Sequence, residues 1–478
     1  MSVRARLKPH RPASGSVLIL VLWLLIVLGT IGLAYSFSVR SQLQVEQLSR
    51  GRIEAYWAAR AGIEKAKAIL ASTDPTTLID SDPLFDSPEV FGEQPIGAAL
   101  FSVVIPTLDP MEEPRFGLRD EGGRINVNTA EEGLLLSLPG MTEEMAQSLI
   151  DWRDEDDQPM AFGAEADYYA ALPDPYPPRN GPLASVRELA RVRGWAPLFH
   201  AAYPDPYVLF LPDSERPETA DPADARWLMG LLTAWSQEDG LAPDGEARMD
   251  LAQVSENELR RRLRTLSGNE AQAIVAHRNQ NPYQSPLDLL SVTTTATDGG
   301  GAGRGRTGAA TPSAANQPAT TQGRGGLTQA AGGGARGGTG SAAAGGGQGQ
   351  RALSLLRVGE IIDYFRVGEA AETGGKVNIN TAPYEALLAV TDFDESLAGA
   401  LVEERSLRGA IDRPGWIVNL PGINESAFRT IYPRITTRSN RFGVTSRGVE
   451  PTSGATVTIE AVLAIEDGAV EVVYWREF

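Results

Sequence analysis

The longest apolar run of the chain lies near its N-terminus. No charged residue occurs in the 24 positions from Ser16 to Val39, and residues 1–15 before them carry four basic side chains and no acid. As a helix, this run extends roughly 36 Å, which is enough to cross a hydrocarbon core of about 30 Å. A basic flank stays on the cytoplasmic side. The pattern predicts one membrane-spanning helix, with the N-terminus in the cytoplasm and the body of the chain across the membrane.

The apolar run leads directly into an amphipathic stretch. Between Leu43 and Leu70, apolar residues recur at near-helical spacing. A cleaved secretory signal peptide is the alternative, but its apolar core would cover about 7–15 residues and end at a small-x-small cleavage site. The run here is longer and lacks such a site. We therefore expect one long helix at 16–71, apolar in its first half and amphipathic in its second.

Short β-type patterns follow this helix and return at the end of the chain. Residues 72–95 have a loop composition, whereas 98–125 contain short alternating runs around turn residues. The last segment, 437–478, alternates more strongly, and Asp467-Gly468 predicts a hairpin turn within it. We expect these strands to pair with those near 98–125. Residues 72–125 and 437–478 would then form the two parts of one core that packs on the N-terminal helix.

A helix–hairpin–helix pattern occurs three times between the predicted strands. It is clearest in module 1, at 126–212, where Thr129 and Thr142 are expected to cap successive helices. Residues 213–292 form a fainter second module, and 351–436 form a third that repeats the Asn-x-Asn-Thr-Ala start of the first. Each module is followed by a short extra helical piece. The sequence therefore predicts an α+β fold with a long N-terminal helix, a small antiparallel sheet and a large inserted helical region.

A Gly/Ala/Thr-rich segment separates the second and third predicted modules. Residues 293–350 contain almost no apolar side chains large enough to form a core. Such a composition predicts a disordered linker or insertion. Its glycines do not form a phosphate-binding loop, because no G-x-x-x-x-G-K-[ST] motif is present.

Composition narrows the possible functions. The chain has no cysteine, three histidines and a formal net charge of −18. The absence of cysteine excludes cysteine-ligated metals, disulfides and thiol catalysis. Only three histidines are available for a Ser-His-Asp triad, and they are far apart in the sequence. With no catalytic constellation in the sequence, we do not expect an enzyme. The acidic balance repels phosphate backbones, so nucleic acid is not an expected partner either.

An acidic segment is the one candidate for a metal-binding site in the sequence. Between Asp151 and Asp167 it places seven carboxylates in 17 residues. Calcium takes six to eight oxygen ligands and tolerates irregular spacing on loops. We therefore predict a calcium site in this segment; a solvated acidic loop is the alternative. The predicted ligands are Asp154, Asp156, Asp157, Glu165 and Asp167.

Taken in order, these motifs resemble the general secretion pathway protein K family, the large minor pseudopilin of type II secretion. The resemblance covers most of the chain outside the Gly-rich segment and a second enlargement at 213–292. It rests on the basic leader, YWAARAGIE (56–64), INVNTA with LPGM and IDWRDEDDQP (125–159), FGAEADYY (162–169), PLASVRELARVRG (182–194), VNINTA (377–382) and the terminal VVYWREF.

The resemblance implies a specific processing step at the anchor. Residues 1–15 correspond to a prepilin leader, which a prepilin peptidase would cut between Gly15 and Ser16, the new and commonly methylated N-terminus. The family of pilins normally carries Glu at the fifth mature position, where this chain has Leu20. Absence of that Glu is typical of the K-type subunit. It implies a place at the tip, because no subunit needs to dock above it.

The resemblance also implies a fold, a location and partners. It implies a pilin-like core with inserted helix–hairpin–helix (SAM-like) modules, held by a single span in the bacterial inner membrane with its body in the periplasm. The implied partners are the I- and J-type minor pseudopilins, the major pseudopilin, the inner-membrane secretion platform and the secreted cargo. Family members bind calcium in the helical region. Here Ala166 replaces the Asp of the usual Gly-Ala-Glu-Asp pattern, with Asp167 next to it.

A different class of function remains open at this point. Helix–hairpin–helix units often bind DNA phosphates, so a membrane-anchored DNA-binding or uptake protein is the alternative. Acidic residues flank the first hairpin on both sides, at 131–132 and 143–144, and would repel phosphate. The basic stretch Arg260–Arg264 in the second module is the only local counterexample, and we interpret it as a solvated helix face.

Overall fold

The computed structural model describes most of the chain beyond its first 14 residues. The described ranges are 15–74, 76–79, 82–106, 114–202, 221–238, 240–293, 351–368, 375–392, 394–466 and 468–478. The leader predicted at 1–15 lies outside them except for its last residue. Apart from Thr293, the Gly-rich segment predicted at 293–350 also lies outside them.

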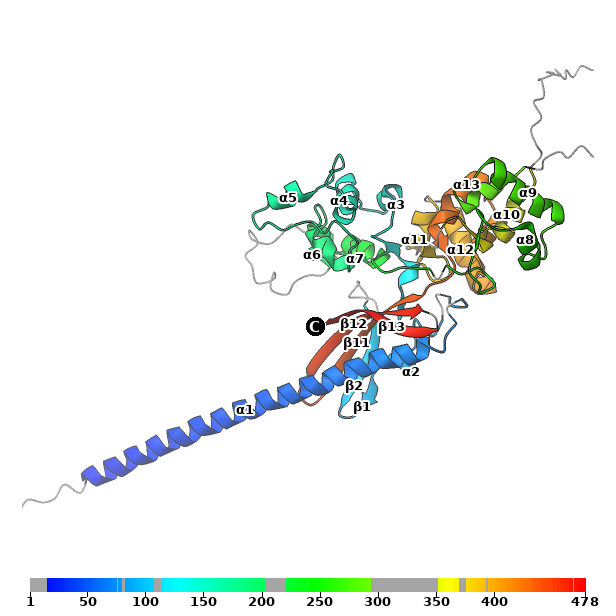
Figure 1. Cartoon of the computed structure of the whole chain (residues 1–478). Coiled ribbons are helices and arrows are strands. Elements are labelled where there is room, and N and C mark those ends of the chain that lie inside the picture. The colour runs from blue at the N-terminus through cyan, green and yellow to red at the C-terminus, as the bar shows by residue number, and fades with distance from the viewer. Residues whose placement is uncertain are drawn as a thin grey trace, which may run out of the picture.

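The first element is a single helix, as the sequence predicts. Helix α1 covers Gly15–Leu70, 56 residues, and is therefore about 84 Å long. Its apolar N-terminal half contacts no other described part of the chain and projects from the body as a rod (Figure 1). Leu20 and Trp23 are each 67% exposed. This half is long and apolar enough to span a membrane, and its exposed apolar side chains are suited to lipid or to partner helices.

The second half of α1 packs on an antiparallel sheet. The strand order is β1-β2-β11-β12-β13, with two short strands, β3 and β4, paired to β2 and β11. The strands are β1 (Gln94–Ile96), β2 (Ala99–Ile105), β3 (Arg115–Phe116), β4 (Arg119–Asp120), β11 (Arg441–Glu450), β12 (Ala455–Glu466) and β13 (Ala469–Glu477). The predicted pairing between the first and last parts of the core is therefore confirmed. The predicted hairpin joins β12 to β13.

Small residues let α1 lie close to the sheet. Ala55 and Ala59 face β11 directly over Gly448, where an added Cβ would overlap the carbonyl oxygen of Ala55. Above and below this crossing, larger side chains such as Ile63 and Phe101 complete a buried core. Close approach at Gly448 thus fixes where the helix crosses the sheet.

Each helical module is closed by the same pair of two-residue strands. In module 1, β5 (Ile125–Asn126) pairs in parallel with β6 (Leu232–Thr233). In module 2, β7 (Met249–Asp250) pairs with β8 (Phe365–Arg366), and in module 3, β9 (Val377–Asn378) pairs with β10 (Ile435–Thr436). The structure therefore contains three tandem modules of one topology, at 125–233, 249–366 and 377–436.

The modules share two helices, a 3₁₀ piece and a third helix in that order; module 1 has an additional helix after the second, and it ends in an α-helix where the others end in a 3₁₀ piece. Module 1 contains α3 (Glu132–Leu136), α4 (Glu143–Arg153), α5 (Ala166–Ala170), η2 (Val186–Arg191), α6 (Ala196–Ala202) and α7 (Pro222–Leu231). Module 2 contains α8 (Glu256–Arg262), α9 (Gly268–Gln280), η5 (Pro286–Ser291), α10 (Leu355–Ile361) and η6 (Ile362–Tyr364). Module 3 contains α11 (Tyr384–Val390), α12 (Glu395–Arg408), η7 (Pro414–Asn419), α13 (Glu425–Ile431) and η8 (Tyr432–Arg434).

Each module has one arginine that binds the loop between its first strand and its first helix. Arg153 near the end of α4 donates to the carbonyl oxygens of residues 127 and 130, and Arg405 in α12 donates to those of residues 379 and 382. Arg278 in α9 makes the equivalent bonds to residues 251 and 254. Each guanidinium thus satisfies backbone carbonyls of the loop between the first strand and the first helix, which has no regular partner of its own.

The structure corrects two of the predicted module boundaries. The predicted boundary at 212/213 separates α7 from module 1, yet α7 packs on α6 and leads into the closing strand β6. Likewise, the predicted range 351–436 places α10 in module 3, but α10 leads through η6 into β8, which closes module 2. The Gly-rich segment therefore lies within module 2, between η5 and α10, and does not separate two modules.

The caps of module 1 agree with the sequence at only one of two positions. Thr142 caps α4, where its hydroxyl accepts a hydrogen bond from the Met145 amide at 3.2 Å. Thr129 does not cap α3, which begins three residues later with Glu131 at the N-cap position and no side-chain cap. The loop after β5 reaches further than expected, because the Asn126 side chain turns it by accepting from the Asn128 amide.

Two adjacent carboxylates join the sheet to the modules. Asp120, at the end of β4, accepts a hydrogen bond from the Asn378 side chain of module 3 at 3.0 Å. Glu121 accepts from the Thr233 hydroxyl at 2.5 Å and pairs with Arg124 at 3.2 Å, both at the edges of module 1. Both carboxylates are buried. Partnered buried charges therefore fix the helical body at one end of the sheet (Figure 1).

Candidate metal site in the helical body

The acidic segment is an insertion that only module 1 carries. In modules 2 and 3, five residues connect the second helix to the following 3₁₀ piece, at 281–285 and 409–413. In module 1, the same connection runs from 154 to 185 and contains the short helix α5. The acidic residues therefore lie where one module departs from the shared frame.

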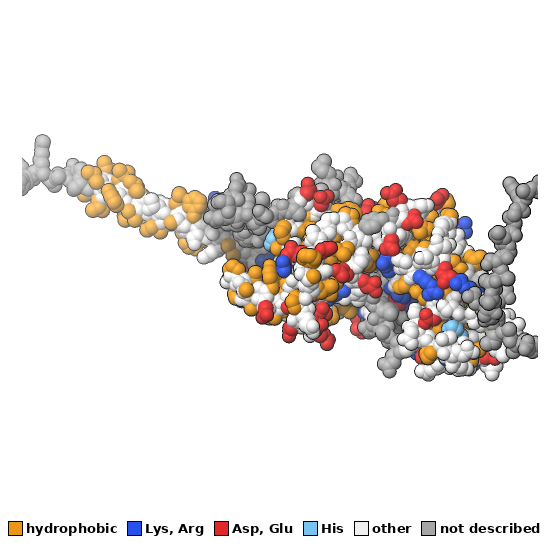
Figure 2. All heavy atoms as spheres, turned by 90° about the horizontal axis from the view of Figure 1, so that it is seen from above, with side chains coloured by type: hydrophobic (Ala, Val, Ile, Leu, Met, Phe, Trp, Pro, Cys, Tyr) orange, Lys and Arg blue, Asp and Glu red, His pale blue; other side chains and the backbone are white. Residues whose placement is uncertain are grey.

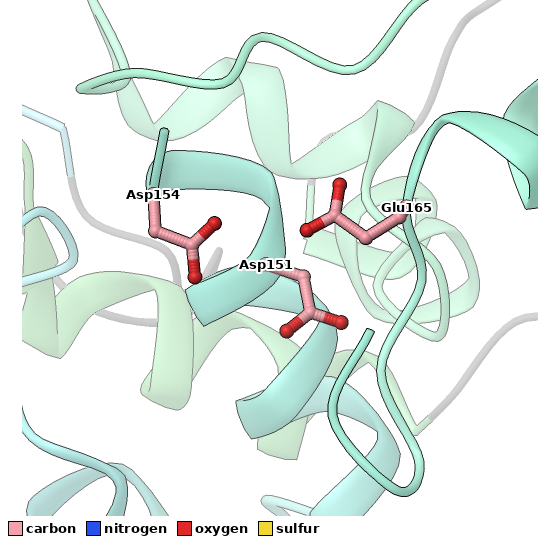
Figure 3. A group of neighbouring side chains, drawn as sticks. All are labelled: Asp151, Asp154 and Glu165. Atoms are coloured by element: carbon pink, nitrogen blue, oxygen red, sulfur yellow. The ribbon is translucent and has the colours of Figure 1, made fainter. Parts of the chain in front are cut away.

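Three carboxylates converge at the base of this insertion. Asp151 lies in the last turn of α4, Asp154 follows its end, and Glu165 comes from the returning chain just before α5 (Figure 3). Each offers one oxygen, and these oxygens lie within 4.8 Å of one another. Asp151 is fully buried and Glu165 is 4% exposed. Like charges at this separation repel strongly unless a proton or a cation lies between them.

The hydrogen-bonding pattern of these carboxylates is incomplete. Both oxygens of Asp151 accept from the Met160 amide, at 3.3 and 3.1 Å. In contrast, both oxygens of Glu165 and Oδ1 of Asp154 are buried and accept no hydrogen bond from any described residue. Buried carboxylate oxygens without donors are costly, and most buried polar groups have a partner. The residues present therefore fit a bound cation, which would satisfy all three oxygens.

The electrostatics of the cluster also favour a bound cation. Burial, together with the charges of Asp151 and Asp154, raises the pKa of Glu165 to about 7. Burial also raises the pKa of Asp151, and burial with the charge of Asp156 raises that of Asp154. Without a cation, the cluster holds a proton up to near-neutral pH; a divalent cation would replace that proton.

The loop of the insertion approaches the cluster closely and is clamped in place. An added Cβ at Gly163 would overlap the Asp151 carboxylate, so this position requires glycine. Arg193, before α6, donates to the Gly163 carbonyl oxygen at 3.0 Å, pairs with Glu144 at 2.6 Å and lies over the Tyr168 ring. Side chains outside the insertion thus position the backbone that carries Glu165.

The structure brings together only part of the predicted ligand set. Asp154 and Glu165 belong to the cluster. Asp156, Asp157 and Asp167 are exposed and do not contribute to it: Asp156 accepts from the Gln158 amide, Asp157 from the Asn180 side chain, and Asp167 lies in the first turn of α5. Whether any of them ligates calcium stays a prediction.

Asp151 is the residue that sequence reasoning left out of the ligand set. It belongs to the acidic segment and lies three residues before Asp154, in the last turn of α4. Spacing along a helix could therefore have identified it. An all-carboxylate set without histidine or cysteine suits a hard cation such as calcium or magnesium. Such a site can brace the insertion.

The residues predicted to act in processing and assembly all lie at the start of helix α1. The helix begins at Gly15, and Leu20 lies on its exposed apolar half, 67% exposed. The side chain of Ser16 lies outside the described residues. The predicted processing and assembly roles of Gly15, Ser16 and Leu20 stay predictions.

Comparison with known proteins points to one family. Residues 123–213 match the family model of protein K of the type II secretion system. A type II secretion system protein K of Pectobacterium carotovorum subsp. carotovorum is 44% identical over 52 residues, which are 11% of this chain and 16% of that relative. The chain thus matches about one sixth of the length of that relative.

Among solved structures, the chain is similar to one from the GspK-GspI-GspJ complex of the enterotoxigenic Escherichia coli type 2 secretion system. The similarity covers 92% of this chain and 99% of the other, with 12% sequence identity and a TM-score of 0.43.

Proposed function

Since the chain belongs to the protein K family of type II secretion systems, we propose that it is a non-enzymatic minor pseudopilin at the tip of a periplasmic pseudopilus. The observation that carries this proposal is the family domain at 123–213, which lies in a body inserted between strands of a sheet that packs on a long apolar helix. The alternative of a DNA-binding uptake protein gains no support from the family match.

The N-terminal helix supports a role in assembly. Its exposed apolar half can lie first in the inner membrane as a single span and later in the core of a fibre, among equivalent helices. In this position, a carboxylate would need a partner from the next subunit, since unpaired charges are costly in apolar surroundings. Leu20 needs no such partner. The subunit can therefore end the fibre.

The partners follow from the proposed position. We expect I- and J-type minor pseudopilins to pack beside α1, the major pseudopilin to lie below them, and the secretion platform and prepilin peptidase to act at the inner membrane. The similar Escherichia coli structure is a complex of GspK with GspI and GspJ. The exposed apolar residues that continue beyond the membrane half of α1, Ile53 and Trp57, are suited to helix–helix contacts.

We propose a structural role for calcium within this function. Residues 154–185 leave the module frame. Where the chain returns, the Glu165 carboxylate faces those of Asp151 and Asp154. A cation at this point would tie the end of α4 to the returning chain. It would thereby hold the insertion in one conformation on the outer surface of the body.

Co-purification tests the proposed function. The full-length chain with an affinity tag is co-expressed with the I- and J-type subunits of the same operon and solubilised in detergent. We expect one stable complex with one copy of each subunit. A chain that binds neither subunit, or that binds duplex DNA tightly and in a salt-dependent manner, would overturn the proposal.

A further inference from the structure

A buried glutamine of module 1 links helix α4 to the insertion that carries Glu165. Gln147 lies in the second turn of α4 and is 9% exposed. Its side-chain oxygen accepts a hydrogen bond from the Phe162 amide at 2.7 Å, and its side-chain nitrogen donates to the Glu132 carboxylate of α3 at 2.7 Å. Both ends of the Gln147 amide are therefore used, one on a neighbouring helix and the other on the insertion.

Gln147 lies on the same face of α4 as two carboxylates of the candidate metal site. Asp151 follows it after four residues and Asp154 after three more, which are the spacings of neighbours along one helix face. Asp151 accepts from the Met160 amide at 3.1 and 3.3 Å, and Gln147 accepts from the amide two residues later. Side chains from one face of α4 thus hold the loop at 160–162 at two points.

The held loop leads directly to the carboxylate that completes the cluster. Gly163 passes so close to Asp151 that an added Cβ would overlap its carboxylate, and Glu165 follows two residues later. The position of the Glu165 oxygens therefore depends on where the loop is held. A cation would draw on the oxygens of Asp151, whereas the amide of Gln147 is neutral and can hold the loop whether or not the site is filled.

The equivalent positions of the other modules have different surroundings. Six positions before the arginine that binds the first loop, module 1 has Gln147, module 2 has Gln272 and module 3 has Gly399. Gln272 is exposed, and Gly399 has no side chain; in both modules the connection after the second helix has only five residues. The burial of Gln147 under a loop therefore belongs to the insertion and not to the shared frame.

Attraction between charges does not by itself distinguish the cluster. Figure 2 shows acidic side chains spread over the surface of the body. Calcium affinity depends on the number of ligand oxygens and on how rigidly they are held. Asp151 is held by helix α4, whereas Glu165 comes from a loop and needs other groups to fix it. Removing a group that orients a metal ligand typically lowers affinity about 10–100-fold.

We propose that Gln147 is a positioning residue of the candidate metal site, which holds the loop of the insertion so that Glu165 faces Asp151 and Asp154. This inference rests on the calcium role proposed above and adds a residue outside the predicted ligand set. Gln147 acts through the backbone amide of Phe162. Through its second hydrogen bond it also joins the loop to α3, so both first helices of module 1 support the site.

Calorimetric titration of calcium into the full-length chain in detergent tests the proposal. We expect Gln147→Met, which is similar in size but lacks the acceptor, to weaken calcium binding roughly tenfold. In the presence of chelator, hydrogen exchange at the Phe162 amide should become faster in the same variant. The matched control is Gln272→Met at the equivalent exposed position of module 2, which should bind calcium like the wild-type chain.

Exchanging the two partners separates positioning from packing. In E132Q/Q147E, a carboxylate oxygen at position 147 can accept from the Phe162 amide and also from the amide at position 132, with no change in net charge. We expect this double variant to recover both the calcium affinity and the slow exchange of the Phe162 amide. A side chain that only fills space in the core would not be restored by this exchange.

Several results would overturn the proposal. Wild-type calcium affinity in Gln147→Met, whatever its thermal stability, would leave the calcium role intact and show that Gln147 only packs. Equal loss in the Gln272→Met control, or no recovery in E132Q/Q147E, would also contradict positioning. A wild-type chain that binds no calcium would overturn the calcium role and this inference together, while co-purification would still test the pseudopilin. If Gln147→Met does not fold, Gln147→Asn, which is one methylene shorter, replaces it.

Discussion

Modules 1 and 2 share a frame but depart from it at different points and with opposite charge. Both are closed by a parallel two-residue ladder, and in both an arginine at the end of the second helix binds two carbonyl oxygens of the first loop. Module 1 inserts residues 154–185 after that helix, whereas module 2 inserts residues 294–350 one piece later, after η5.

This difference indicates where function lies in the body. The shared frame is built from backbone pairing, one central arginine in each copy and a common core. The insertions lie outside this frame. The insertion of module 1 brings three carboxylates to one buried point, whereas the sequence of the insertion in module 2 contains four arginines and one acidic residue. The frame thus serves as a scaffold, and the insertion of module 1 gives that module a candidate site of its own.

The largest expected effect comes from breaking the frame. Arg405→Met should lower the free energy of unfolding by about 3 kcal/mol, because the fully buried guanidinium donates to two carbonyls that would lose their partner. Arg278→Met should cost about half as much, since one of its bonds is long, at 3.4 Å, and its site is only partly buried. Urea denaturation followed by tryptophan fluorescence measures both. Equal costs would contradict a frame whose strength follows burial.

The next effect distinguishes the acidic insertion from the rest of the frame. If a cation binds at the Glu165 cluster, calcium at about 100 times its Kd should stabilise the chain by about 2.7 kcal/mol. Glu165→Gln should abolish this gain, while Glu155→Gln, at an exposed position of the same segment, should keep it. Thermal unfolding with calcium and with chelator measures the difference. No shift in Tm with millimolar calcium for the wild-type chain would contradict the site.

A pH dependence should also appear in module 1. The folded chain raises the pKa of Glu165 from its ordinary value to about 7, so the protonated form is favoured in the folded state. In the absence of calcium, its contribution to stability is therefore fully present below about pH 4.5 and is lost as the pH rises towards 7. Hydrogen exchange of residues 154–170 measures this directly. Glu165→Gln should remove the dependence; persistence of the same pH profile in that variant would assign it to another group.

The smallest effect is expected from the other insertion. Removing half of residues 294–350 should stabilise the chain by about 0.6 kcal/mol, because loop-closure entropy changes slowly with length. The ends of the insertion remain joined by the bridge between Thr293 and Arg351. A loss of stability of several kcal/mol would mean that this segment packs on the body, and the contrast between the two insertions would be wrong.

Much of the fold could be predicted from local patterns. The long helix follows from an uninterrupted apolar run and a helical period, and α1 ends within a residue of the expected position. The pairing of β11 with β2 on one side and with β12 on the other follows from alternation, which places Val457, Ile459 and Leu463 of β12 on one buried face. Strong periodicity over many residues is the common property of these correct predictions.

The module boundaries and the carboxylate cluster depend on contacts between residues far apart in the sequence, which no local pattern reveals. The sequence places α7 and α10 in the wrong modules, because a long segment separates each of these helices from the preceding part of its own module. Two-residue strands such as β6 and β8 are too short to show alternation, although they define the modules. At the metal site, the acidic composition indicated the segment, but only the return of the chain shows that Asp151 and Glu165 meet.

The central claim is that this chain ends a pseudopilus, and the position of the chain in the fibre tests it most directly. Pseudopili assembled with an epitope-tagged full-length chain are labelled with gold-conjugated antibody and imaged by electron microscopy. The account predicts gold at one end of each fibre and nowhere along the shaft, and it predicts fewer capped fibres for Leu20→Glu. Gold distributed along the shaft, or fibres that never carry label, would contradict it.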